Sequence, residues 1–117
     1  MDLLEELKAK GVNVEEAIER FLGNASLYEK MLMKFLDLMN DMAVDTGFDC
    51  NEYNDIIEKT HAIKGAAGNL SITPIYEAYT DIVNLLRAQQ PEQAKLVLEK
   101  IVPVQNDIIE CIKKYHK

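Results

Sequence analysis

Apolar residues recur at intervals of three and four along almost the whole chain, which is the spacing of one face of an α-helix. No stretch of strand length alternates Val, Ile or Thr with polar residues, as a half-buried β-strand does. This periodicity predicts an all-α protein. The chain has 117 residues, of which 48% are hydrophobic, so we expect one folded domain over residues 1–117.

Two short helices are expected before the longer ones. Leu3 and Leu7 mark the first, which Gly11 can end because glycine readily adopts the left-handed backbone conformation. Asn13 and Glu16 form a capping-box pattern that begins the second short helix, which ends near residue 23.

Four longer helices follow, separated by short connections. A second capping-box pattern, Asp49 with Glu52, begins one of them, and Thr73-Pro74 supplies an N-cap and a first-turn proline for the next. We expect these helices over residues 24–42, 50–71, 74–88 and 91–115, with Pro103 kinking or splitting the last. Long helices with short connections favour an antiparallel up-down-up-down four-helix bundle, with the short N-terminal helices packed on it.

Charge and cysteine usage narrow the possible partners and location. The whole chain has a net charge of −7, and residues 1–60 alone have a net charge of −8. This negative charge argues against binding to nucleic acid or to an anionic membrane surface. No apolar run is long enough to span a membrane, and the start of the chain is acidic where a signal peptide is basic. Cys50 and Cys111 lie far apart and are expected to be free thiols. We therefore expect a monomeric, cytoplasmic protein.

One histidine does not fit a plain bundle helix. At 100° per residue, the expected buried face of the fourth helix passes through Ile56, Thr60 and Ile63, and His61 points away from it. Gly65 and Gly68 follow at i+4 and i+7, although each costs a helix about 1 kcal/mol relative to alanine.

The two glycines indicate a functional role for His61. Bare backbone beside an exposed imidazole lets another macromolecule reach the ring, as transfer of a group between two proteins requires. Lys64, on the flank of the same strip, can offset negative charge placed on His61. We define His61, Gly65 and Gly68 as the His61 strip. Because both glycines are expected to face open space, alanine at 68 is expected to stabilise the helix.

The segment His61-Ala62-Ile63-Lys64-Gly65-Ala66-Ala67-Gly68-Asn69-Leu70 resembles the signature of histidine-containing phosphotransfer (HPt) domains of bacterial phosphorelays. The resemblance extends over most of the chain, because that family has a helical bundle of about this length and a similar lead-in to residues 13–42. Two positions depart from the family's pattern. Ser71 stands where the family often has glycine, and Pro103 interrupts the last helix.

The resemblance implies a function and partners. The histidine matching His61 is the phosphoacceptor in that family, the lysine matching Lys64 assists the phosphate, and the glycines matching Gly65 and Gly68 admit a response-regulator receiver domain. The protein is then a phosphocarrier with no ATP site and no cofactor of its own, and the receiver supplies Mg²⁺. A hybrid sensor histidine kinase is a further candidate partner.

We expect the partner to dock over the third and fourth helices. A modest apolar ring around the reactive histidine is expected, formed by Ile57, Gly65, Gly68, Met33 and Ile72. A relay intermediate must release both donor and acceptor, so the complex should be small and transient.

Other chemistries find less support. Glu58-x-x-His61 matches half of a di-iron bundle motif, but the second copy is missing, because the remaining histidine, His116, has a lysine three residues before it and is expected to be a solvated tail residue. The chain has no nucleophile elbow and no nucleotide-binding loop. The alternative that stays open is a helical scaffold, or an HPt-like protein that binds a receiver without being phosphorylated.

Overall fold

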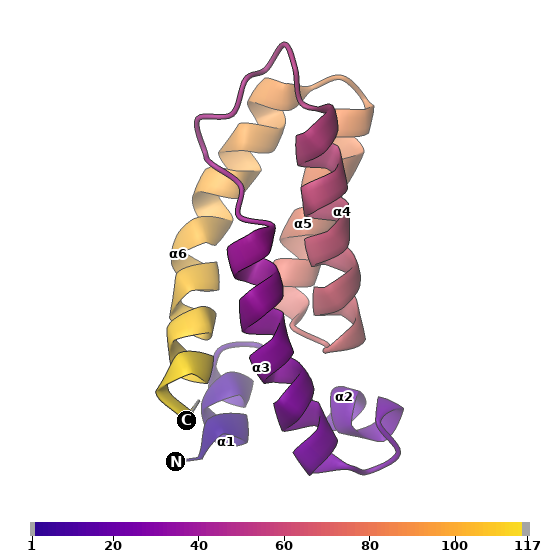
Figure 1. The fold of residues 1–117 in the computed structure, drawn as a ribbon, viewed down its shortest axis with the longest axis vertical. Coiled ribbons are helices and arrows are strands. Elements are labelled where there is room, and N and C mark those ends of the chain that lie inside the picture. The colour runs from indigo at the N-terminus through magenta and orange to yellow at the C-terminus, as the bar shows by residue number, and fades with distance from the viewer. Residues whose placement is uncertain (1, 116–117) are drawn as a thin grey trace.

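The computed structural model describes residues 2–115, and within this range the chain forms six α-helices and no β-strand (Figure 1). The helices are α1 (Leu3–Ala9), α2 (Val14–Arg20), α3 (Ala25–Asp41), α4 (Asn54–Asn69), α5 (Thr73–Arg87) and α6 (Pro91–Tyr115). They pack together as a bundle with principal extents of 43 × 25 × 22 Å. The prediction of an all-α fold is confirmed.

The long helices share one core. Figure 1 shows α4, α5 and α6 extending along most of the long axis, α3 beside them over part of it, and α1 and α2 at the lower end. One fully buried side chain from each long helix illustrates the core: Leu32, Ile63, Ile82 and Ile108, each 0% exposed. The short helices pack on this core through Leu7 and Ala17, which are also 0% exposed.

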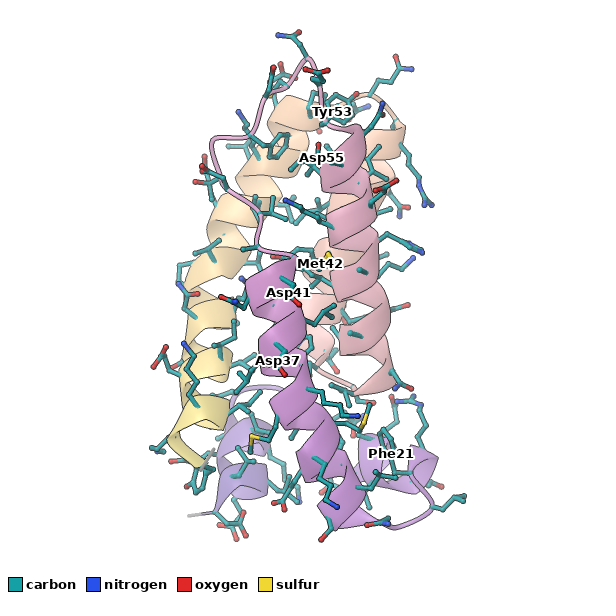
Figure 2. All side chains as sticks on the ribbon, viewed as in Figure 1. Phe21, Asp37, Asp41, Met42, Tyr53 and Asp55 are labelled. Carbon is teal, nitrogen blue, oxygen red and sulfur yellow. The ribbon has the colours of Figure 1, made fainter. Side chains whose placement is uncertain are left out.

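A long connection joins the end of α3 to the start of α4 and runs along the upper part of the bundle, beyond the end of α3. Figure 2 shows Met42 where α3 ends and Tyr53 at the top of the bundle, and the chain climbs between them. The expected start of the fourth helix at residue 50 is wrong, because α4 begins at Asn54. The Asp49 carboxylate accepts a hydrogen bond from the backbone N–H of Asn51 at 2.8 Å, so it closes a local turn instead of capping a helix. Phe48 is buried and anchors the connection on the core.

The structure also corrects the expected start of α5 and shows the course of α6 at Pro103. The N-cap of α5 is Ile72, and Thr73, expected as the cap, is instead the first helical residue. Helix α6 is continuous through Pro103, so this proline does not split it. The proline leaves the carbonyl of Glu99 without its helical donor, but both residues are exposed and water can reach that carbonyl.

Candidate functional site: an exposed histidine on α4

His61 lies on the solvent-facing side of α4. The opposite side is buried and consists of Ile56, Thr60, Ile63 and Ala67, as the helical periodicity predicts. The Thr60 hydroxyl donates to the carbonyl of Ile56 at 2.8 Å, which lets a polar residue sit in the core. Among the described residues nothing forms a hydrogen bond or ion pair with the His61 ring, so its nitrogens are available to a partner.

Gly65, one turn after His61, has no packing reason to be glycine. No side chain or neighbouring element comes within 4 Å of the position that a Cβ would take there. Its backbone is helical, so it does not need the left-handed conformation that favours glycine. The residue therefore costs α4 about 1 kcal/mol without an intramolecular benefit.

Gly68 differs from Gly65, because the ring of Tyr76 packs on it. A Cβ at residue 68 would lie 2.8 Å from Cδ1 and 2.9 Å from Cε1 of that ring. The expectation that alanine at 68 meets only open space is wrong. Gly68 brings α5 close to α4 and seats an aromatic side chain beside the His61 strip.

Lys64 and Ile57 flank His61 along α4. Both are half-buried, so their stems lie against the bundle while part of each side chain reaches the surface. No ion pair holds the Lys64 ammonium group within the part of the chain that the structure describes. Its charge is therefore free to interact with an anion on or near His61.

Two residues expected around His61 lie elsewhere. Met33 is half-buried and lines a groove between α3 and α6 together with Met39 and Ile109, whereas Met31 and Leu38 line the α3 side that faces α4. Ile72 is 0% exposed, so its side chain is in the core and not on the exposed surface. The apolar ring near His61 therefore contains neither of them.

Helix α4 ends in a Schellman motif, which explains the burial of Ile72. The backbone N–H of Ser71 donates to the carbonyl of Gly68 at 3.2 Å, and the backbone N–H of Ile72 donates to the carbonyl of Ala67 at 2.9 Å. Ser71 has a φ of 53°, in the left-handed region that favours glycine. This conformation gives a physical reason why glycine suits the position at which the sequence has Ser71.

Glu16 and Arg20 of α2, together with Ser71, form a polar clamp that holds this helix end. The Arg20 guanidinium donates to the carbonyls of Gly68 (3.3 Å) and Asn69 (2.9 Å) in the last turn of α4, and to the Ser71 hydroxyl (2.9 Å). The Glu16 carboxylate accepts from the Ser71 hydroxyl at 2.8 Å and from Arg20 at 3.1 Å. The hydrogen bond from Ser71, and then that from Arg20, lower the pKa of Glu16 below its ordinary value of 4.5.

The capping box expected at the start of α2 forms only in part. The Asn13 side chain accepts from the backbone N–H of Glu16 at 3.2 Å, so Asn13 is the N-cap. The backbone N–H of Asn13 donates to the carbonyl of Ser71 at 2.9 Å instead of to the Glu16 side chain. Tyr28 adds a further bond to this region, donating to the carbonyl of Leu70 at 2.8 Å, and burial raises its pKa.

An open groove runs from the His61 strip to the polar clamp, and we call it the α2–α4–α5 groove. Its volume is about 680 Å³. The lining residues are Asn13, Glu16, Arg20, Gly65, Gly68, Asn69, Ser71, Thr73, Tyr76 and Glu77. Gly65 and Gly68 belong to both the strip and the groove, so the two surfaces are continuous.

Sequence reasoning missed Arg20 and Tyr76 as neighbours of the strip. Arg20 is separated from Gly68 by 48 positions, and periodicity within α2 does not reveal what its exposed end contacts. A weak signal for Tyr76 existed, because a glycine inside a helix is often a site of close packing as well as of access.

The described residues form no candidate metal site. Within residues 2–115 no group of three or more His, Cys, Asp or Glu side chains is arranged to hold a metal ion. His116 of the di-iron alternative lies outside the described residues. No helix in the described range is long and apolar enough to cross a membrane.

Comparison with known protein families, curated proteins and solved structures gives no significant match.

Proposed function

We propose that the protein is a histidine phosphocarrier of a two-component phosphorelay. His61 accepts a phosphoryl group from the aspartyl phosphate of one receiver domain and passes it to the aspartate of another. In this role α3 to α6 form an antiparallel up-down-up-down four-helix bundle, and the protein acts as a monomer in the cytoplasm.

The observation that carries the proposal is the open space at Gly65, one turn from an exposed His61. A glycine in the middle of a helix costs stability, and here no neighbour within the described chain uses the missing side chain. Access for a second protein supplies a use for it. An incidental surface histidine gives no reason for the glycine beside it.

The chemistry needs few groups from this chain. A neutral His61 nitrogen attacks the phosphorus, the N–P bond forms as the P–O bond to the receiver carboxylate breaks, and the carboxylate leaves with the electron pair. The other ring nitrogen keeps its proton. Lys64 offsets the added negative charge, because phosphoryl transfer depends mainly on positioning and charge neutralisation. The receiver is expected to supply Mg²⁺ and most of the transition-state stabilisation, so the carrier needs no ATP site or cofactor.

The test is incubation of the protein with a panel of phosphorylated receiver domains, followed by measurement of label on the carrier. His61→Gln removes the phosphoacceptor, and His116→Gln is the matched control at the other histidine. We expect label on the wild type and on His116→Gln, and none on His61→Gln. If no receiver labels the wild type, or if His61→Gln is labelled as well as the wild type, the proposal is wrong. Binding of a receiver without label would support the scaffold alternative instead.

A further inference from the structure

Tyr76 is the one exposed aromatic side chain among residues 2–115. It is 39% exposed, whereas Tyr28, Phe35 and Tyr79 are at most 2% exposed. The other described aromatic residues are buried or half-buried: Phe21, Phe48, Tyr53 and Tyr115. The most exposed of the described aromatic rings therefore lines the α2–α4–α5 groove.

The backbone of α4 limits where the Tyr76 ring can lie. Tyr76 packs on Gly68, with ring carbons 2.8–2.9 Å from the place of the missing Cβ. A side chain that is already held in place loses little conformational entropy when a partner covers it. Tyrosine is also among the residues that contribute most to binding when they are central in an interface.

Distance places Tyr76 within reach of any globular partner of His61. Gly68 follows His61 by seven residues, which is about 10 Å along α4. A standard interface covers roughly 800 Å² on each partner, equivalent to a disc of about 16 Å radius. An interface of this size that is centred on His61 is therefore wide enough to cover the ring on Gly68 as well.

The groove beyond the ring offers fixed polar groups. Arg20 is held by four hydrogen bonds, two within the polar clamp and two to carbonyls at the end of α4, and Glu77 adds an exposed carboxylate on α5. Glu16 and Glu77 outnumber the single guanidinium, so the groove carries a surplus of negative charge. This surface is complementary to a partner edge that carries basic or hydrogen-bond-donating side chains.

We propose that Tyr76 is the aromatic anchor of the receiver-docking surface, and that this surface extends from His61 over Gly65 into the α2–α4–α5 groove. This inference depends on the proposed phosphocarrier function. It moves the docking surface from the α3 side of α4, where the sequence alone placed it, to the α2 and α5 side.

The test compares transfer from a receiver with transfer from phosphoramidate, a small phosphoryl donor that needs no docking surface. Tyr76→Ala removes the anchor, and Leu96→Ala is the matched control, because Leu96 is 59% exposed on α6 and does not line the groove. We expect Tyr76→Ala to lower kcat/KM with the receiver by about tenfold or more. Labelling by phosphoramidate should be unchanged, and Leu96→Ala should behave like the wild type in both reactions.

The outcomes separate the two proposals. Equal receiver kcat/KM for wild type, Tyr76→Ala and Leu96→Ala overturns the anchor while the phosphocarrier function stands. A wild type that no receiver labels overturns the function, and the anchor with it. If Tyr76→Ala does not fold, Gly68→Ala serves as the second variant, because its Cβ displaces the ring without removing it. We expect it also to lower receiver kcat/KM, and an unchanged value would overturn the anchor.

Discussion

The ring of Tyr76 occupies the space that a side chain at Gly68 would need, with Cδ1 2.8 Å from the position of a Cβ. This close approach couples α5 to the helix that carries His61. It gives Gly68 a structural role that Gly65 does not have.

A double-mutant cycle measures that coupling. In the wild type, Gly68→Ala should lower the free energy of unfolding by about 1 kcal/mol, because displacing a packed ring costs more than the gain in helix propensity. In a Tyr76→Ala background the same change should raise it by about 1 kcal/mol. Urea unfolding of the four proteins tests this. An equal effect of Gly68→Ala in both backgrounds would show that the ring yields without cost.

Gly65→Ala should separate stability from transfer. A Cβ there points into open space, so the free energy of unfolding should rise by up to about 1 kcal/mol. Receiver-dependent labelling of His61 should nevertheless slow, because the added methyl group lies where a partner approaches. Thermal unfolding and transfer kinetics on the same preparation give both values. A variant that is stabilised and transfers at the wild-type rate would remove the access argument.

Leu22 tests the cost of left-handed backbone at helix ends. It has a φ of 58° and is 96% exposed, so it bears the strain without making compensating contacts. Leu22→Gly should raise the free energy of unfolding by about 1 kcal/mol. Ser71→Gly relieves a similar φ of 53° but removes the hydroxyl that bonds Glu16 and Arg20, so it should gain less or lose stability. Denaturant unfolding that ranks Ser71→Gly above Leu22→Gly would contradict this account.

Features set by residues within one or two helical turns follow from the sequence, whereas contacts between separate helices do not. Periodicity predicted the six helices and the outward direction of His61, because both depend on residues within one or two turns. Helix α4 begins later than the sequence predicts, because the Asp49 carboxylate closes a turn with Asn51, and a helix cap uses the same residue types. The packing of Tyr76 on Gly68 and the capping of α4 by Arg20 join separate helices, which intervals along one helix do not encode. For the same reason the sequence places Ile72 on the surface, whereas the Schellman motif directs its side chain into the core.

Acid should weaken the polar clamp through Glu16. Its pKa is lowered in the folded state, so its stabilising effect is present above the ordinary value of 4.5 and is lost as pH falls through the lower folded value. The wild type should therefore lose more stability than Glu16→Gln between neutral pH and about pH 3. Glu99→Gln, at an exposed position of α6, should lose about as much as the wild type. Equal acid losses for wild type and Glu16→Gln in urea unfolding would mean that the carboxylate does not stabilise this helix end.

A phosphorelay role for His61 requires that it hold a phosphoryl group between two receiver domains. The most direct measurement is a two-step transfer: label the protein with one phosphorylated receiver, isolate it, locate the phosphoryl group by mass spectrometry, and then add a second, unphosphorylated receiver. We expect label on His61 and not on His116, and loss of that label to the aspartate of the second receiver. Label on any other residue, or label on His61 that no receiver removes, would contradict it.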